Sequence, residues 1–142
     1  MRESFLTSIV NSLQSGLPVL LLQFVVTLAL LGIGVACYMS ITPFRERELV
    51  ARGNTAGGIV FGGSIIALAI PLAATLANST VVLDIVVWGI VALILQLLAF
   101  AFATLLFRNL RAELEAGNVA AALSLVALQI AIALLNAGAM SG

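Results

Sequence analysis

The polar side chains that fall inside long apolar segments are the first candidates for chemistry in this sequence. Asp84 and Gln96 lie in one such segment, and Gln129 lies near the middle of another. Polar groups are costly in hydrocarbon, so each marks either a contact between helices or a polar pathway. Two further amides, Gln23 and Asn136, fit the contact interpretation.

Asp84 permits two interpretations. It lies about one turn from the start of its segment, where the helix dipole stabilises an acid. It is also placed to contact a cation or a proton in a vestibule at the outer surface. Gln96 follows twelve residues later, which puts the two side chains roughly 120° apart around a helix. They therefore do not share one narrow stripe, and this weakens a simple pore along that helix.

The sequence contains no motif for catalysis or for metal binding. It has no His and a single Cys, so it lacks His-based metal sites, an HExxH motif and a Cys pair. Its six basic residues are balanced by six acidic ones, which leaves no net charge to attract a nucleic acid. We therefore expect no enzyme, no cofactor, no metal site and no nucleic-acid partner.

Composition identifies the elements that must position the polar residues. Of the 142 residues, 63% are hydrophobic and 8% are charged, against about 25% charged in a soluble domain. The mean hydropathy is +1.25. About 20 apolar residues span the hydrocarbon core as a helix. The sequence predicts an all-α, polytopic membrane protein with four transmembrane helices, at about 17–41, 55–77, 81–107 and 119–139.

Residues 1–16 differ from the apolar segment that follows them. Phe5, Ile9 and Leu13 recur every four residues, and Ser and Asn fill the other face. This pattern is typical of a short amphipathic helix that lies on the membrane surface. The alternative is that residues 1–16 simply extend the first span.

The arginines indicate the orientation. The loops 42–54 and 108–117 hold five of them, whereas the opposite side holds only Arg2. Cytoplasmic loops carry an excess of Lys and Arg. We therefore expect a bacterial inner-membrane protein with both loops in the cytoplasm and both termini on the non-cytoplasmic side.

The two charged loops resemble each other. One runs from Phe44-Arg45 to Gly53-Asn54 and the other from Phe107-Arg108 to Gly117-Asn118, and both contain Glu-Leu-x-Ala. The similarity predicts two tandem helical hairpins, 17–77 and 81–139, each with two spans. Two spans return the chain to its starting side, so the hairpins are expected to be parallel and related by a pseudo-two-fold axis along the membrane normal.

The Gly-Asn pair at each loop end has two possible roles. Asn54 and Asn118 are placed to cap the helices that follow, and Gly53 and Gly117 allow a sharp turn before them. The alternative is a cytoplasmic site for an anion or a substrate at the paired helix starts.

Glycines in the second span predict close helix packing. Gly57 follows Gly53 by four residues, and Gly62 follows Gly58 by four. Small residues at this spacing let helix backbones approach one another. We expect this face to pack against the fourth span or against another subunit, which favours a homo-oligomer.

These features carry a family resemblance. A chain with four spans and a charged loop that reads Glu-Leu-x-Ala-x-Gly-Asn-x-Ala resembles the domain of unknown function 350 family, the YjfL-like bacterial inner-membrane proteins. Asp84 and Trp88 match the Asp-x-x-x-Trp of that family, whereas the second loop lacks the residue between Ala116 and Gly117. The resemblance implies an inner-membrane location, duplicated hairpins and a link to envelope-stress or membrane-remodelling proteins, with no assigned activity.

Two functions follow from these observations. The favoured one is a non-enzymatic, oligomerising membrane module, linked to envelope stress or membrane organisation, whose cytoplasmic loops meet lipid or membrane-associated proteins. The alternative is an oligomeric channel or transporter for an ion or a small solute, with Asp84, Gln96, Gln129 and the two Gly-Asn helix starts as its candidate residues.

Overall fold

A computed structural model describes residues 1–42 and 45–142, and this part of the chain consists of helices and connecting turns without a strand. The helices are α1 (Arg2–Ile41), α2 (Glu46–Ala51), α3 (Thr55–Asn78), α4 (Val82–Leu106), α5 (Leu110–Glu115) and α6 (Val119–Met140). Four of them, α1, α3, α4 and α6, are long and apolar enough to cross a membrane. The prediction of an all-helical protein with four spans is therefore confirmed.

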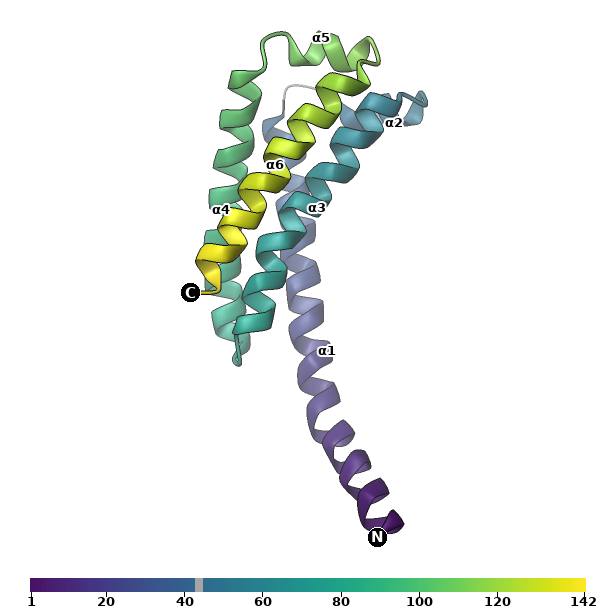
Figure 1. Cartoon of the computed structure of the whole chain (residues 1–142), viewed down its shortest axis with the longest axis vertical. Coiled ribbons are helices and arrows are strands. Elements are labelled where there is room, and N and C mark those ends of the chain that lie inside the picture. The colour runs from purple at the N-terminus through teal and green to yellow at the C-terminus, as the bar shows by residue number, and fades with distance from the viewer. Residues whose placement is uncertain (43–44) are drawn as a thin grey trace.

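The four long helices form a bundle that is covered at one end by α2 and α5 (Figure 1). We call this the loop end. The turn between α3 and α4 and the C-terminus lie at the opposite end, which we call the far end. The most extensive contact is between α3 and α6, while α4 packs on α1, α3 and α6. The N-terminal part of α1 projects beyond the far end and away from the other helices.

Helix α1 is longer than a membrane is thick. Its 40 residues correspond to about 60 Å, twice the hydrocarbon core of about 30 Å. Its buried residues are Leu30, Gly34 and Tyr38, four apart along one face. Residues 2–16 continue the helix without a break, as expected if they extend the first span. Whether they lie on the membrane surface stays a prediction.

Glycines set the close approaches between the long helices. A Cβ atom on Gly63 would clash with Val126 of α6, and one on Gly34 would lie 2.6 Å from Leu93 Cδ2 of α4. A Cβ on Gly57 would lie 2.5 Å from Leu49 Cβ of α2, whereas Gly58 and Gly62 face open space within the chain. The predicted contact of the second span with the fourth thus runs through Gly63. Packing of Gly58 and Gly62 against another subunit stays a prediction.

The two loops end in the same local geometry. Gly53 and Gly117 have positive φ angles of 73° and 79°, which glycine adopts without strain. Asn54 and Asn118 then cap α3 and α6, each accepting a hydrogen bond from the backbone N–H three residues on, at 2.9 Å and 3.2 Å. The repeat of two hairpins stays a prediction, and Phe44, with which the first loop motif begins, lies outside the described residues.

Candidate functional site

Six buried polar side chains from five helices form a line through the bundle, which we call the polar track. Ordered from the loop end towards the far end, its members are Glu46 (α2), Tyr38 (α1), Ser64 (α3), Gln129 (α6), Gln96 (α4) and Asn136 (α6). All are at most 9% exposed. Polar side chains that are buried among apolar helices mark either contacts between helices or a functional site.

Gln129 is the centre of the polar track. It lies ten residues into α6, so it is about 15 Å from the start of that helix, near mid-membrane. Its Oε1 accepts a hydrogen bond from Ser64 Oγ at 3.0 Å. Its backbone carbonyl accepts one from Gln96 Nε2 at 3.1 Å. Helices α3, α4 and α6 are thereby joined at one depth.

Asn136 extends the polar track towards the far end. Its Nδ2 donates to the backbone carbonyl of Ala92 at 3.1 Å and, over a longer 3.5 Å, to Gln96 Oε1. Asn136 lies seven residues beyond Gln129, a rise of about 10 Å. The amides of Gln96, Gln129 and Asn136 therefore cover the far half of the bundle core.

Tyr38 and Glu46 form the loop-end part of the polar track. The Tyr38 hydroxyl lies among Glu46, Ser64 and Gln129, and its ring packs edge-on against Phe100, with the centroids 5.3 Å apart. Glu46 is the first residue of α2 and is only 2% exposed. Burial raises its pKa above the ordinary value because the charged form loses its hydration, although neighbouring hydrogen-bond donors partly oppose this shift.

Several atoms of the polar track remain without a hydrogen-bond partner. Among the described residues, the buried side-chain atoms in this state are Tyr38 OH, Glu46 Oε1, Gln129 Nε2 and Asn136 Oδ1. Buried polar atoms are satisfied in most proteins, because leaving one unpaired costs about 1–3 kcal/mol. All four belong to the polar track, so its members retain free hydrogen-bonding capacity.

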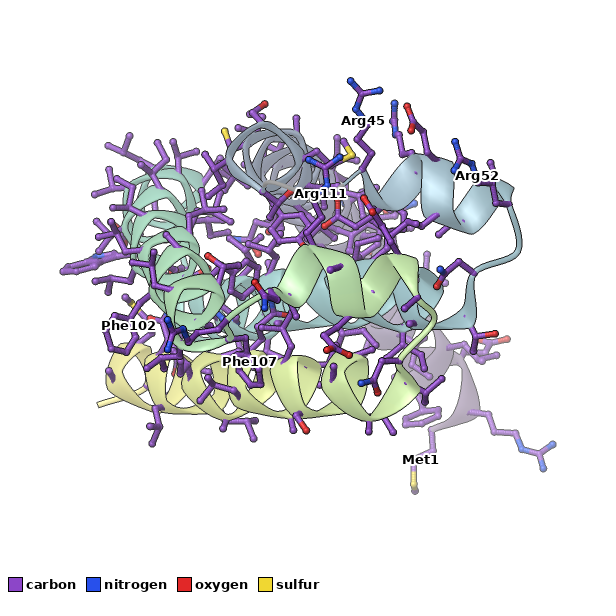
Figure 2. The ribbon with its side chains drawn as sticks, turned by 90° about the horizontal axis from the view of Figure 1, so that it is seen from above. Met1, Arg45, Arg52, Phe102, Phe107 and Arg111 are labelled. Atoms are coloured by element: carbon purple, nitrogen blue, oxygen red, sulfur yellow. The ribbon has the colours of Figure 1, made fainter. Side chains whose placement is uncertain are left out.

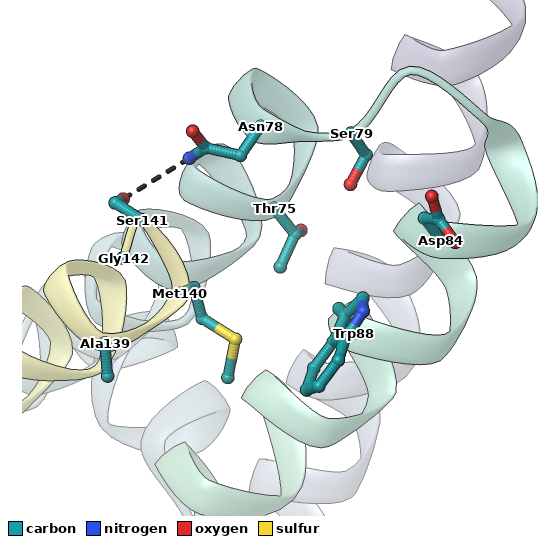
Figure 3. Close-up of a pocket in the computed structure, with 9 residues that line it drawn as sticks. All are labelled: Thr75, Asn78, Ser79, Asp84, Trp88, Ala139, Met140, Ser141 and Gly142. Atoms are coloured by element: carbon teal, nitrogen blue, oxygen red, sulfur yellow. Dashed lines mark hydrogen bonds between the residues drawn. The ribbon is translucent and has the colours of Figure 1, made fainter.

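A cavity of about 420 Å³ lies at the far end, where α3, α4 and α6 meet (Figure 3). Its lining residues are Thr75, Asn78, Ser79, Asp84, Trp88, Ala139, Met140, Ser141 and Gly142. Asn78 Nδ2 donates to Ser141 Oγ at 3.3 Å across its rim. Met140 lies one helical turn beyond Asn136 on α6. The cavity therefore begins about one turn from the last residue of the polar track.

The loop end carries mixed charges. Figure 2 looks onto this end and shows Arg45 and Arg52 near α2 and Arg111 on α5. Arg45 pairs with Glu48 at 2.9 Å and Arg111 with Glu115 at 2.8 Å. Together with Leu49 and Asn54, these five residues line a cavity of about 360 Å³. The surface is therefore close to neutral rather than strongly basic.

The structure brings some of the predicted site residues together and separates others. Gln96 and Gln129 are hydrogen-bonded at the core, whereas Asp84 is exposed and lines the far-end cavity. Asn54 and Asn118 act as caps, and Asn118 Nδ2 also donates to Glu113 Oε2 at 2.7 Å. A carboxylate at that helix start disfavours an anion there.

Sequence reasoning missed Glu46, Tyr38 and Ser64. Tyr38 was open to detection, because Leu30, Gly34 and Tyr38 recur every four residues and so define the inward face of α1. Glu46 carried no such signal. It lies between Arg45 and Arg47 in a charged loop, where a carboxylate is normally solvated.

Comparison with known proteins places the chain in a family. The family described as Domain of Unknown Function (DUF350) matches residues 12–140. Over 118 residues the chain is 31% identical to the "UPF0719 inner membrane protein YjfL" of Escherichia coli K12, covering 83% of this chain and 89% of that protein. The same figures hold for the protein of that name in Escherichia coli O157:H7. No solved structure matches. This chain therefore belongs to the DUF350 family, as a multi-pass membrane protein with inner-membrane relatives.

Proposed function

We propose that this chain provides a pathway for a small cation across the inner membrane, through the interior of its own helical bundle. The observation that carries the proposal is the polar track, which begins at Glu46 beside the loop end and stops one helical turn short of the far-end cavity. The only acids along this route are Glu46 at one end and Asp84 at the other, and no arginine belongs to the polar track. Such a route favours a cation over an anion.

This proposal reverses the preference drawn from the sequence, for a physical reason. Asp84 and Gln96 do not share a stripe on one helix, and this weakens a pore along α4 alone. A polar route need not follow one helix. Side chains from five helices make up the polar track, and its amides are buried and hydrogen-bonded to one another. Larger solutes are therefore disfavoured as cargo.

Flux into liposomes tests this proposal. Purified protein is reconstituted, and gradients of protons, sodium, potassium and chloride are imposed one at a time, with protein-free liposomes as the control. We expect at least one of the three cations to cross faster than in the control, while chloride does not. If no cation crosses faster than in protein-free liposomes, the proposal is wrong.

The second candidate is a homo-oligomeric membrane module that meets membrane-associated proteins at its loop end, with a role in envelope stress or membrane organisation. The open face at Gly58 and Gly62 favours it, because backbones of neighbouring subunits approach closely at such positions. The ion-paired surface of Arg45, Glu48 and Arg111 suits a polar protein contact. Assembly and cation passage are compatible in one molecule.

Leucine substitutions separate assembly from folding. Gly58→Leu and Gly62→Leu add side chains into open space within the chain, so we expect the monomer to fold and the oligomer to weaken by cross-linking and by size in detergent. Gly63→Leu is the matched control, because its side chain would clash with Val126. We expect it to lower the thermal stability of the monomer itself. An unchanged oligomer in the first two variants would remove this face from the interface.

A further inference from the structure

The far-end cavity is lined by one acidic side chain, that of Asp84 (Figure 3). Both ion pairs found in the described residues lie at the loop end, so neither includes this carboxylate. The arginines lie elsewhere, five of them in the loops and Arg2 at the tip of the projecting part of α1. The carboxylate at the cavity is therefore not neutralised by any side chain that the structure describes.

The polar side chains around this carboxylate present acceptors to a ligand. Thr75 Oγ1 and Ser141 Oγ each donate their hydrogen to a backbone carbonyl of the preceding helical turn, both at 2.8 Å. Asn78 Nδ2 donates to a carbonyl of α3 at 2.8 Å and to Ser141 Oγ at 3.3 Å. These three side chains therefore have only oxygen lone pairs left for a ligand. The Ser79 hydroxyl and the Trp88 indole N–H are the other side-chain donors that line the cavity.

An aromatic ring forms another wall of the cavity. Trp88 follows Asp84 by four residues on α4, and side chains at this spacing lie about 5–6 Å apart on a helix surface. Figure 3 shows the indole ring beside Asp84, with the Met140 side chain of α6 pointing towards it. A cation that is held by the carboxylate can therefore also lie within about 6 Å of the ring, the range of a cation–π contact.

We propose that the far-end cavity is a binding site for an organic ammonium group, held between the Asp84 carboxylate and the Trp88 ring. The volume of about 420 Å³ falls in the usual range of small-molecule sites, about 300–1,000 Å³. This inference goes beyond the proposed function and does not rest on it, because the ligand binds at one end of the bundle and is not the cargo.

The ammonium group has two possible sources, which are a free amine and the headgroup of phosphatidylethanolamine. Asp84 is the third residue of α4, and Ser141 directly follows the last residue of α6. The 25 residues of α4 span about 38 Å, more than the hydrocarbon core of about 30 Å. The cavity therefore opens at the level of the lipid headgroups, where both sources have access.

The chemistry of the cavity favours an organic ammonium over other charged ligands. Its N–H groups donate to the oxygen acceptors, its charge pairs with the carboxylate, and its carbon atoms pack on the indole ring and the Met140 thioether. An anion would meet lone pairs and a negative charge. A metal ion such as Ca²⁺ takes about six to eight oxygen ligands, and no group of three or more His, Cys, Asp or Glu that could hold a metal is found in the described residues.

Tryptophan fluorescence tests this inference, because Trp88 is the single tryptophan of the chain and lines the cavity. The full chain is reconstituted into vesicles of phosphatidylglycerol, and ethanolammonium chloride is added on both sides of the membrane. The controls are ethylene glycol, in which a hydroxyl replaces the ammonium group, and sodium chloride at the same ionic strength. We expect a saturable change in fluorescence with ethanolammonium, and no saturable change with either control.

Variants separate ligand binding from simpler roles of the same residues. Asp84 also lies in the first turn of α4, where the helix dipole stabilises an acid, and a tryptophan at this level anchors a helix at the membrane surface. Glu3→Gln is the matched control for Asp84→Asn, because Glu3 is likewise an acid in the first turn of its helix but does not line the cavity. We expect Asp84→Asn to weaken the affinity for ethanolammonium at least about tenfold and Glu3→Gln to leave it unchanged. Asp84→Glu keeps the carboxylate and should retain saturable binding.

Vesicles that also contain phosphatidylethanolamine distinguish the two sources of the ammonium group. If the lipid headgroup fills the cavity, added ethanolammonium will change the fluorescence only in the vesicles that lack this lipid. If the ligand is a free amine, the change will occur in both kinds of vesicle. Either result supports an ammonium site.

Three results would overturn the inference. They are the lack of a saturable change with ethanolammonium in phosphatidylglycerol vesicles, an equal response to ethylene glycol, and an equal affinity in the wild type and in Asp84→Asn. The first two are measured on the wild type, so they do not depend on the folding of a variant. The measurement involves no ion gradient, so failure of the ammonium site and failure of the cation pathway are observed separately.

Discussion

Gln96→Leu is expected to abolish most cation flux while leaving the bundle folded. Gln96 is fully buried and links Gln129 to Asn136. Leucine has a similar volume but no polar atom, so it places an apolar barrier in the polar track. We expect the flux to fall at least about tenfold, which corresponds to a barrier increase of about 1.4 kcal/mol. The measurement is ion flux into liposomes at equal protein content.

The folded state should tolerate this change. A hydrogen bond between membrane helices is worth about 0.6 kcal/mol on average and at most about 1.7 kcal/mol. Gln23→Leu is the control, because Gln23 is the same residue type in a span but donates only to the Thr80 carbonyl, outside the polar track. Equal loss of flux in both variants would contradict a role for the polar track.

A reporter fused after Gly142 that is active only in the cytoplasm is expected to be silent. Five of the six arginines lie in the two loops, and α2 and α5, which those loops contain, cover one end of the bundle. The C-terminus lies at the opposite end, so the excess of arginine in the loops predicts that it lies outside the cytoplasm. The effect should be all or none, and cellular reporter activity measures it.

The same reporter fused after Arg52 is the control and should be active, since this position lies just beyond α2 at the loop end. Activity after Gly142 combined with silence after Arg52 would reverse the orientation. Glu46 would then lie at the outer end of the proposed cation pathway and Asp84 at its cytoplasmic end.

The spans were predictable because hydropathy alone decides them. The second, third and fourth spans begin and end within about two residues of the sequence expectation. The first differs, because α1 begins at Arg2 rather than near residue 17. Gly16 and Pro18 lie within it, and the polar Ser and Asn residues before them resemble a separate segment. Nothing in the local pattern required the helix to stop.

The interior of the bundle was only partly predictable. Gln96 and Gln129 stand out because amides are rare in apolar runs, and both belong to the polar track. The sequence did not single out Gly63 as the glycine that contacts Val126. That contact depends on how α3 is rotated about its axis. The burial of Glu46 depends on α2 packing on α3 through Leu49, three residues further on. The sequence of a charged loop does not indicate such a tertiary contact.

The confinement of the polar track to a single chain has a genetic consequence. In a channel whose pore lies between subunits, one mutant subunit inactivates the whole oligomer. The mutant allele is then dominant. Here each subunit carries its own complete set of polar residues, from Glu46 to Asn136. A cell that expresses both a normal and a Gln96→Leu allele would therefore lose activity only in proportion to the mutant share, and the defect would be recessive.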